Sequence, residues 1–576
     1  MKHVIIIGNG ISGLSCAIRC AKKGVSATLV SPFPSERAQS VMAAGGINAV
    51  LSGADAKDSV DCHIRDTLDG GCGLGGEQAV AGLCGHAEEV IRELERLGTV
   101  FSLDESGHLS RRAFGGQSHK RTYYCGASTG KQIVSALVME ARRYEAKGLI
   151  RRMTGYRFYS ALIREKRCYG TLLFHEKSGE LLPEYADAVV IASGGQNALF
   201  GKTTGSTQCD GYVTGKLFLQ GVELKNLEFI QYHPTTLETA HKRMLISEAA
   251  RGEGGRLFYE KEGDRIYFME DKYGAGGNLM CRDVVAREMY ATREQVYLDV
   301  SFLGKTVIEN RLSEVRDLCL KYAGIDISRQ PIPVAPSVHF FMGGIAVHLN
   351  HETCIRNLFA VGECASIYHG ANRLGGNSLL AAVYGACVAA DEIAVRAKTD
   401  DTRVEADDTL LRFGGNSTNA AADEVMSRPA ASGRPDFEHE IMEERQKLQR
   451  LRQTESRFSV TYLRDMLAET MREDLGIVRS LEGLLGGIRD VDYYLSVADR
   501  LNYDSSVPLW LNYSLKPILS LAKATLLCAK SRQESRGAHY RSDYPDSDKA
   551  CQAATLISCN DGNWQVRLDR ERVYES

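Results

Sequence analysis

Residues 3–7, HVIII, form a short apolar run that predicts a buried β-strand at the start of the chain. A helical pattern of apolar positions follows over residues 14–23, and residues 25–30 predict a second strand. The turn between the first strand and the helix carries the glycines of GNGISG, which are Gly8, Gly10 and Gly13. Glycines at this spacing let the backbone approach a pyrophosphate at the positive end of a helix. The strand, glycine turn, helix and strand together predict a dinucleotide-binding unit.

Two more apolar runs, residues 188–191 and 358–361, predict strands that end in the glycine turns ASGGQN and GEC. Three such turns on one sheet suit a large flavin dinucleotide, because phosphate, ribose and ring all need close backbone approach. Nicotinamide-binding folds place an acidic residue after the second strand, but Ser31 stands there, which disfavours a simple NAD enzyme. The glycine-rich run at residues 43–46, AAGG, could lie flat against a ring, although a plain loop has the same composition.

Residues suited to acid–base chemistry gather between positions 226 and 255. Pro234 follows His233, so we expect a regular element to end there and the imidazole to lie at its edge. Glu248 and Arg251 are three residues apart and would share a helix face, where the simplest interpretation is a surface ion pair. The glycines that follow in RGEGG favour close packing of the backbone instead.

The pattern changes after residue 398. Residues 399–435 are polar and rich in glycine, which predicts a linker with at most one short helix. Residues 436–502 carry apolar residues at helical spacing, which predicts a bundle packed on the nucleotide-binding unit. The apolar positions include Met442, Leu448, Leu451, Leu463, Met466 and Leu467. The pattern fits a docking surface and a bundle that only buries itself equally well.

Composition narrows the class of protein. The chain has 576 residues, 44% hydrophobic and 25% charged, which is enough for several globular domains. The net charge of -3 and the absence of a Lys/Arg block argue against nucleic-acid binding. The N-terminal apolar run is too short for a signal peptide, and no run reaches about 18 apolar residues. We therefore expect a cytoplasmic chain that does not cross a membrane by itself.

The sixteen cysteines are scattered and include no C-x-x-C pair, which argues against zinc or iron–sulfur ligation and predicts no metal in this chain. Cys16 and Cys20 lie one helical turn apart and are expected to be buried free thiols in a reducing compartment. A redox enzyme without its own metal centres must pass electrons to something else.

Nine motifs occur in an order that resembles the flavoprotein subunit of the succinate dehydrogenase and fumarate reductase family. The motifs are SVMAAGGINAV, FGGQS, QYHPTTL, SEAARGEGG, CRDVVARE, HFFMGG, FAVGECA, HGANRLGGNSLL and ESRGAH. The resemblance implies an α/β fold in which a Rossmann-like FAD-binding domain is interrupted by an α+β capping domain and followed by a helical domain and a C-terminal arm. The implied boundaries are 1–225 and 342–398 for the FAD-binding domain, 226–341 for the cap, 399–435 for the linker, 436–535 for the helical domain and 536–576 for the arm.

The resemblance also implies roles for particular residues in hydride transfer between flavin N5 and fumarate or succinate. Arg282 delivers the proton, with Glu248 and Arg251 as its relay, although a pKa above about 12 makes arginine an unusual acid. The residues that hold the substrate carboxylates are His233, Ser247, His339 and Arg373. Guanidiniums suit this task because their paired donors match two carboxylate oxygens.

The same resemblance places a set of residues at FAD. They are Gly8, Gly10, Ser12, Gly13, Ser31, Ser40, Ala44, Gly45, Gly46, Ala192, Gly194, Asp210, Glu363, Arg373, Ser378 and Leu379. Gln39 stands where membrane-bound members carry the histidine that bonds to the flavin, so we expect FAD to be held without a covalent bond. The loss of that bond should lower the flavin potential and favour fumarate reduction. Residues 203–211 form a shorter loop than the family's and carry Cys209, which leaves the flavin contacts there open.

Two alternative functions remain. L-aspartate oxidases share the HPT, RGEG and RD motifs, but they place an acidic residue beside the glycine pair where this chain has Phe114. A non-catalytic electron-relay subunit would not need the substrate cations Arg282, His233 and Arg373. The resemblance implies an iron–sulfur subunit of a respiratory complex as partner, with a membrane anchor subunit that would hold this chain at the inner face of the cell membrane.

Overall fold

The computed structural model describes residues 3–570 except for 127, 241, 406–434, 452–458, 499, 502–506 and 561. A parallel five-stranded sheet, in the order β19-β10-β1-β2-β6, lies at the centre of the molecule. Its strands are β1 (His3–Ile7), β2 (Ser26–Ser31), β6 (Ile150–Thr154), β10 (Ala188–Ile191) and β19 (Leu358–Ala360). Val4, Ile5 and Ile6 are completely buried, as expected for a parallel sheet that is covered on both faces.

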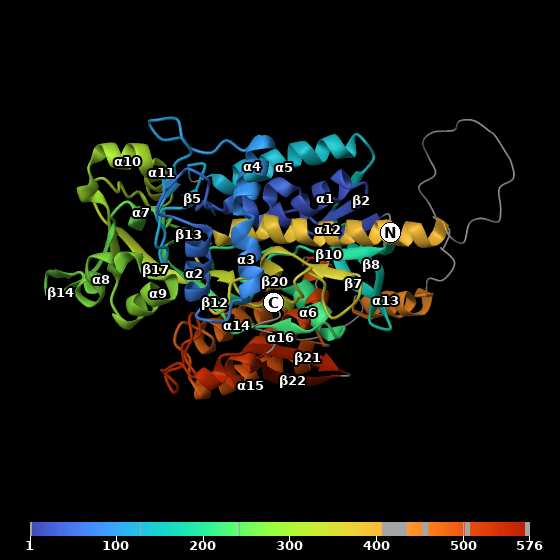
Figure 1. Ribbon diagram of the computed structural model, residues 1–576. Helices are drawn as coiled ribbons and strands as arrows, with labels where there is room; N and C mark the ends of the chain where they lie inside the picture. Colours follow the sequence, from blue (N-terminus) through green and yellow to red (C-terminus); the bar gives the residue numbers. More distant parts are fainter. Residues whose placement is uncertain are drawn as a thin grey trace.

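Two long helices pack together beside this sheet, α1 (Ile11–Lys22) and α12 (Asn377–Glu405) (Figure 1). α1 starts three residues earlier than its apolar pattern predicted, because the chain turns into the helix directly after Gly10. Residues 377–398 of α12 are apolar and long enough to cross a membrane, with a mean hydropathy of 1.6. Because 56% of this stretch is buried inside the protein, α12 is a core helix of the fold.

Other elements within residues 3–225 surround this sheet. They are the helices α2 (Val60–Gly70), α3 (Glu77–Gly85), α4 (Ala87–Arg96), α5 (Thr129–Glu145) and α6 (Tyr212–Leu219), the sheet of β3 (Ile47–Asn48), β5 (Thr122–Tyr123) and β4 (Arg111–Arg112), and the antiparallel sheet of β7 (Tyr156–Arg164), β8 (Arg167–His175) and β9 (Leu181–Tyr185). Cys16 and Cys20 on α1 are buried free thiols, as predicted.

Residues 230–341 form a second unit, called the cap here, at one end of the molecule (green in Figure 1). Its six-stranded sheet has the order β13-β12-β17-β16-β14-β15, and Leu257, Met289 and Leu298 belong to a hydrophobic core separate from the central one. The strands are β12 (Ile230–Glu238), β13 (Arg243–Leu245), β14 (Arg256–Lys261), β15 (Asp264–Ile266), β16 (Val296–Asp299) and β17 (Ile332–Phe341). The helices are α7 (Ala249–Gly252), α8 (Phe268–Tyr273), α9 (Arg282–Ala291), α10 (Lys305–Arg311) and α11 (Ser313–Ala323).

One expectation for the cap is wrong. Pro234 does not end a regular element, because β12 continues through it to Glu238. The pairing of β12 with β17 shifts register between His233 and Thr236, so the proline lies in an irregularity where no ladder hydrogen bond is required of it. His233 therefore projects from the middle of a strand.

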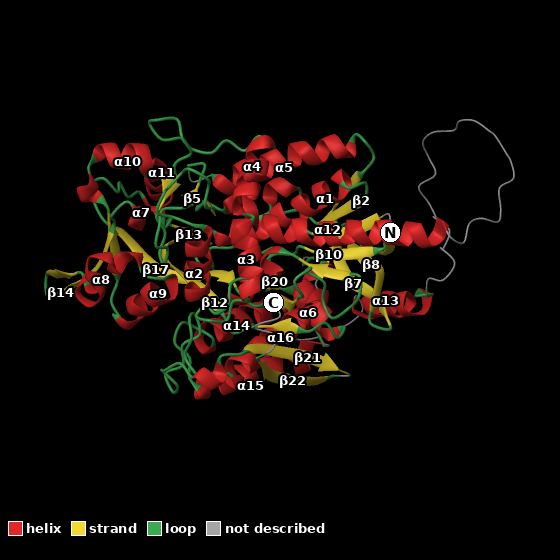
Figure 2. Cartoon of the chain, in the orientation of Figure 1, coloured by secondary structure: helices red, strands yellow, loops and turns green. Residues whose placement is uncertain are grey.

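The described residues of the C-terminal part form several helices and a hairpin (Figure 2). These are α13 (Glu438–Leu451), α14 (Val460–Asp474), α15 (Leu481–Ala498), α16 (Leu509–Ser531), β21 (Ala554–Asn560) and β22 (Asn563–Asp569). The hairpin extends a sheet of β11 (Leu224–Lys225), β18 (Gly344–Ala346) and β20 (Ala365–Ser366). Leu448, Leu463 and Leu467 are buried as their spacing predicted, but Met442 is 53% exposed. Residues 399–405 of the predicted linker continue α12, and 406–434 lie outside the described residues.

A buried ion-pair cluster joins the C-terminal part to the rest of the chain. Arg532, at the end of α16, donates to Glu228 at 2.7 Å and to Glu534 at 2.8 Å, and all three side chains are fully buried. Its guanidinium also donates to the Thr555 hydroxyl at 2.7 Å. Removal of the arginine would leave Glu228 buried without its cation, while Glu534 would keep its ion pair with Arg536 at 2.8 Å.

We expect Arg532→Ala to lower the free energy of unfolding by about 3–5 kcal/mol, as breaking a buried ion pair does. Urea unfolding followed by tryptophan fluorescence measures the change. The control is Lys305→Ala, whose exposed pair with Glu309 should contribute less than about 1 kcal/mol. Equal midpoints for the two variants would show that the cluster does not stabilise the fold.

Candidate active site

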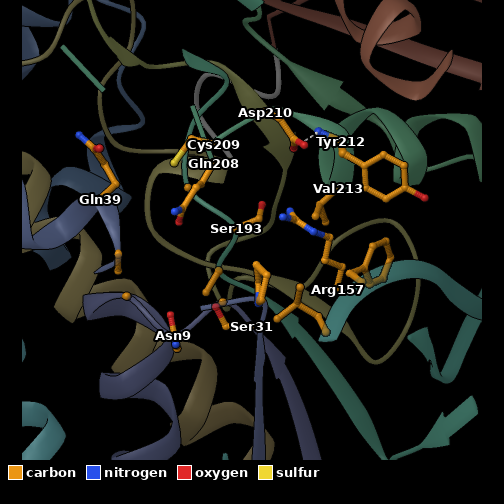
Figure 3. A pocket seen from close by; sticks show the side chains of 18 of the residues that line it. Asn9, Ser31, Gln39, Arg157, Ser193, Gln208, Cys209, Asp210, Tyr212 and Val213 are labelled. Carbon is orange, nitrogen blue, oxygen red and sulfur yellow. Dashed lines mark hydrogen bonds between the residues drawn. The ribbon is translucent and has the colours of Figure 1, made fainter. Parts of the chain in front are cut away.

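Two adjoining cavities lie at the carboxyl ends of β1, β2 and β10, where parallel sheets bind their ligands. The larger has a volume of about 420 Å³ and extends between the sheet and the cap, and the smaller has a volume of about 150 Å³. Figure 3 shows the smaller cavity, with Asn9 just after β1, Ser31 at the end of β2 and Gln39 at one side. Residues that line both cavities are Gly10, Gln39, Ser40, Ala192 and Gly194. The two cavities therefore form one elongated site.

The structure brings almost all the predicted FAD residues to this site. Those that line the larger cavity are Gly10, Ser12, Ser40, Ala44, Gly45, Gly46, Ala192, Gly194, Glu363, Arg373, Ser378 and Leu379. The smaller cavity adds Gly8, Ser31 and Asp210. Gly13 lines neither cavity. A Cβ at Gly13 would lie 1.9 Å from the Gly8 carbonyl oxygen, so the glycine allows α1 to pack closely against the end of β1.

The backbone around the first turn fits a dinucleotide. Gly8 has φ +113°, and a Cβ on it would lie 2.2 Å from the carbonyl oxygen of Ala192. The first turn of α1 has no side-chain cap from its N-cap residue and no acidic residue. Apart from the N–H of Ile11, which donates to the Ser40 hydroxyl at 3.2 Å, the first N–H groups and the positive end of the helix can serve a phosphate anion.

The predicted substrate and catalytic residues meet at the cap side of the larger cavity. The ones that line it are His233 from β12, Ser247 and Glu248 from the turn before α7, Arg282 from the start of α9, His339 from β17, and Arg373 from the loop before α12. Arg251 lies in α7 and does not line the cavity. Segments more than 100 residues apart thus supply one cluster of charge.

Glu248 lies between two guanidiniums. Its Oε2 accepts hydrogen bonds from Arg282 Nε at 2.8 Å and Nη2 at 2.6 Å, while Oε1 lies 3.3 Å from Arg251 Nη2. The N–H of Gly115 donates to Oε1 at 2.8 Å. Burial alone would raise the pKa of Glu248, but Arg282, Arg251 and the Gly115 N–H outweigh it and hold the pKa at about 2. The carboxylate is therefore ionised at neutral pH, and Arg251 forms the far end of an Arg–Glu–Arg chain.

Gln231, which the sequence did not single out, joins the two arginines that face the cavity. Its Oε1 accepts from Arg282 Nη1 at 3.1 Å and from Arg373 Nη2 at 2.9 Å. Its Nε2 donates to the Asn372 side chain at 2.8 Å and to the Arg373 carbonyl at 2.7 Å. Gln231 is two residues before His233 on β12, and alternation along a strand places both on the same face. That alternation is the signal that could have identified it.

The two histidines are neutral in this environment. Their rings meet edge to face with centroids 5.1 Å apart, and His339 Nδ1 lies 2.8 Å from the hydroxyl of Thr204. Burial, and then the positive charge of Arg282, lowers the pKa of both His233 and His339 well below the usual value. Neutral imidazoles can hydrogen-bond a carboxylate without adding charge to the cluster.

Arg373 is incompletely paired. Its guanidinium lies 4.2 Å from the centre of the Phe340 ring, and its buried Nε has no hydrogen-bond partner. Burial and the nearby Arg282 lower the pKa of Arg373 well below that of a free arginine. An anion bound in the cavity would supply the missing acceptor and stabilise the charged form.

Glu363 and Gln39 border the cavity at the sheet. Burial raises the pKa of Glu363 to about 7, although its carboxylate accepts from the Phe341 N–H at 3.2 Å. The amide oxygen of Gln39 accepts from the N–H of Ser206 at 2.6 Å and so fixes the short loop that carries Cys209. Cys209 is buried in this loop and lies beside Gly194.

Two protein-family models together match most of the chain. The FAD binding domain model matches residues 3–379, and the model of the fumarate reductase flavoprotein C-terminal domain matches residues 464–576. The chain belongs to the succinate dehydrogenase/fumarate reductase flavoprotein family. It is thus an FAD-dependent oxidoreductase, and the predicted fold class is confirmed.

Relatives of this flavoprotein differ in the name of their reaction. The succinate dehydrogenase flavoprotein subunit of Bacillus subtilis is 33% identical, over 95% of this chain and 92% of the relative. The CoM/CoB fumarate reductase of Methanothermobacter marburgensis has a subunit that is also 33% identical, over 96% of each chain. These identities establish the family but not the substrate.

Solved structures give the same fold. FrdA of the quinol fumarate reductase of Escherichia coli matches with a TM-score of 0.85 and 28% identity, over the full length of both chains. Adenylylsulfate reductase from Archaeoglobus fulgidus matches with a TM-score of 0.76 at 16% identity, over 98% of this chain and 95% of that one. The second likeness shows the fold alone, so the chemistry has to be argued from the site.

We expect Gln231→Leu to reduce kcat/KM by about 10- to 100-fold, because two charged donors lose their shared acceptor. Flavin content should stay normal, since Gln231 lies on the substrate side of the cavity. Steady-state kinetics and the visible spectrum provide both measurements. Gln295→Leu is the control, because that amide bonds only to backbone carbonyls of the cap. Unchanged kinetics in Gln231→Leu would mean that the two guanidiniums are positioned without it.

Proposed function

We propose that the chain is the catalytic flavoprotein subunit of a fumarate reductase/succinate dehydrogenase and that it favours fumarate reduction. The observation that carries the proposal is the charge of the buried cluster. Arg251, Arg282 and Arg373 contribute three positive charges, and Glu248 contributes one negative charge. A dicarboxylate dianion would neutralise the excess of two.

The side chains that face the cavity divide into two groups for the two substrate carboxylates. Arg373, with its unpaired Nε and the neighbouring His339, can hold one carboxylate with paired donors. His233 and Ser247 provide neutral donors for the other. Gln231 fixes the distance between Arg282 and Arg373, so the double bond would lie beside Arg282.

FAD, when bound and reduced by the electron partner, would supply the hydride to one carbon of the double bond. Arg282 is proposed to donate a proton from its guanidinium to the other carbon. Its Nε and Nη2 both donate to Glu248, which therefore holds the guanidinium in place and can return the proton. Burial lowers the pKa of Arg251 despite the adjacent Glu248, so Arg251 gives up a proton to the chain more easily than a free arginine would.

Water is largely excluded from this cluster. Arg282 is 7% exposed, and the side chains of Glu248 and Arg251 are 1% and 0% exposed. Electrostatic interactions are stronger in such a site than in water. The positive charges are already in place before the reaction, so they can stabilise the negative charge that develops on a substrate carboxylate.

The cofactor is proposed to be held without a covalent bond. Gln39 has no imidazole nitrogen to bond to the flavin, and its amide oxygen is already used by Ser206. A flavin without that bond has a lower potential, which supports reduction of fumarate over oxidation of succinate. The proposed direction of turnover rests on this lower flavin potential and not on the geometry of the residues that would hold the substrate.

The electron partner is proposed to be an iron–sulfur subunit, with a membrane anchor subunit that holds the complex at the inner face of the cell membrane. The sixteen cysteines are all free in the structure. One group of possible metal ligands, Asp58, Cys62 and His119, lies close together among the described residues, but Asp58 is paired with Arg121 at 2.8 Å. This chain therefore offers no iron–sulfur ligand set of its own within the described structure.

Amino-acid oxidation has less support. Phe114 is 2% exposed and contacts the positions of Gly45 and Gly375, where an aspartate oxidase would need an acidic group for the substrate amine. Glu248 is the nearby carboxylate, and two guanidiniums already neutralise it. An ammonium group beside Phe114 would therefore meet a carboxylate that is already paired.

Dye-linked turnover on one preparation of the native complex tests the function. We expect reduction of fumarate to exceed oxidation of succinate, and no oxidation of aspartate, because the arginines suit two carboxylates and Glu248, the carboxylate beside Phe114, is already paired with two of them. Succinate oxidation at an equal or higher rate would contradict the proposed direction. Aspartate as the fastest substrate would contradict the proposed substrate class.

Three variants separate the proposed roles. Arg282→Ala should lower kcat by more than about 10²–10⁴-fold, since proton donation and charge stabilisation are both lost, with a smaller effect on binding. Arg373→Ala should mainly raise KM, because it holds the substrate in the ground and transition states alike. Glu248→Gln should slow turnover while the flavin content stays normal. Steady-state kinetics with fumarate and the visible spectrum of each variant measure these effects.

The control for this series is Arg287→Ala. Arg287 belongs to α9, as does Arg282, but its guanidinium lies 5.0 Å from the centre of the Tyr540 ring. We expect turnover to be unchanged in this variant. Loss of activity in Arg287→Ala together with an active Arg282→Ala would show that the proton donor is wrongly assigned.

A further inference from the structure

The smaller cavity contains one residue that comes from the C-terminal helices. The cavity is lined by the ends of β1 and β2, by β7 and by the start of α6, all within residues 1–225, and by Trp510 of α16 (Figure 3 shows the other walls). Among the described residues that line it, Trp510 is the only one from beyond position 225. The C-terminal helices thus reach the nucleotide-binding unit through this indole.

Trp510 carries a buried hydrogen-bond donor that nothing in the described structure satisfies. The residue is 5% exposed, and its Nε1 has no hydrogen-bond partner. Indole N–H is a donor only, and buried tryptophans usually have an acceptor for it. Two other polar groups of the same cavity are already used, since Asn9 donates to the Phe33 carbonyl at 2.6 Å and Tyr212 to the Tyr159 carbonyl at 2.6 Å.

The indole is held firmly in place. Its ring meets Tyr212 edge to face at 4.5 Å, and the Arg157 guanidinium lies 5.2 Å from its centre. One turn further along α16, Tyr513 stacks on Tyr159 at 4.3 Å, and the Tyr159 hydroxyl donates to Glu444 of α13 at 2.6 Å. These contacts fix the start of α16 against the wall of the cavity.

We propose that the indole N–H of Trp510 donates a hydrogen bond to the adenosine half of FAD and thereby helps this chain to retain a cofactor that is not covalently bonded. Adenine fits the cavity because its faces are apolar and its edge carries acceptor nitrogens. The flavin ring belongs in the larger cavity beside His233 and Arg282, so the other end of an elongated dinucleotide reaches the smaller one. The proposal rests on the non-covalent attachment proposed above.

Trp510, which would compensate for the missing covalent bond, thus comes from the C-terminal helices and not from the nucleotide-binding unit. Arg157, which extends into the cavity in Figure 3, lies between the rings of Phe33 and Trp510 and supports the indole from one side. Because α16 places Trp510 at the smaller cavity, the chain would bind FAD in preference to flavins that lack adenosine.

The test uses the full chain produced in a riboflavin-starved host, which gives flavin-free protein however the cofactor is attached. Wild type, Trp510→Phe and Trp564→Phe are each titrated with FAD, FMN and ADP. We expect Trp510→Phe to weaken FAD and ADP binding by about 3- to 10-fold, the range for one neutral hydrogen bond, and to leave FMN binding unchanged. Trp564→Phe, the other tryptophan of the chain, should change none of the three.

Three outcomes would overturn the assignment: unchanged FAD affinity in Trp510→Phe, an equal loss for FAD and FMN, or ADP binding that does not depend on Trp510. An equal loss would mean that the indole only supports the fold. Acid precipitation of the flavin-loaded protein is a separate measurement. Flavin that stays with the pellet would contradict non-covalent attachment, while the ADP titration would still decide the role of Trp510.

Discussion

The cap side of the larger cavity depends on one carboxylate between two guanidiniums. Without Glu248, Arg251 and Arg282 would be two buried cations with no carboxylate between them, a costly arrangement. With it, both guanidiniums remain charged and fixed, and the cluster still carries excess positive charge toward the cavity. Buried ion pairs often add little to stability. The ion pairs of Glu248 are better explained by the chemistry that a fixed cation can perform.

Topology places that cation where the nucleotide-binding sheet ends. The carboxyl ends of parallel strands form one edge of the sheet, and the cap is inserted between the strands β10 and β19 that border this edge. α9 then brings Arg282 from the cap, while the loop before α12 brings Arg373 from the sheet side. Gln231 of the cap accepts a hydrogen bond from each guanidinium. These bonds fix Arg282 and Arg373, and therefore the cap and the sheet, relative to one another at the cavity.

Much of this arrangement could be predicted from the sequence. The first strands and the glycine turn were predictable because local periodicity and the spacing of Gly8, Gly10 and Gly13 report backbone geometry directly. The charged cluster was predictable only through motif order, since no local pattern says that Arg373 meets Glu248. Pro234 was misjudged because a strand can accommodate a proline at an irregular pairing. Gln231 was predictable only from its alternation with His233 along β12. Trp510 was not predictable, because a single indole has no pattern until the fold supplies its neighbours.

The two ends of the site follow one physical rule. Buried polar groups are nearly always satisfied, so a group that the protein leaves unsatisfied points to a ligand. Arg373 Nε has no acceptor at the substrate end, and Trp510 Nε1 has none at the opposite end. Each is held by aromatic contacts, Arg373 over Phe340 and Trp510 against Tyr212, so neither group can move to water. Ligands that supply the two acceptors would remove both costs, which would favour binding of the proposed substrate and cofactor at groups that the protein alone cannot satisfy.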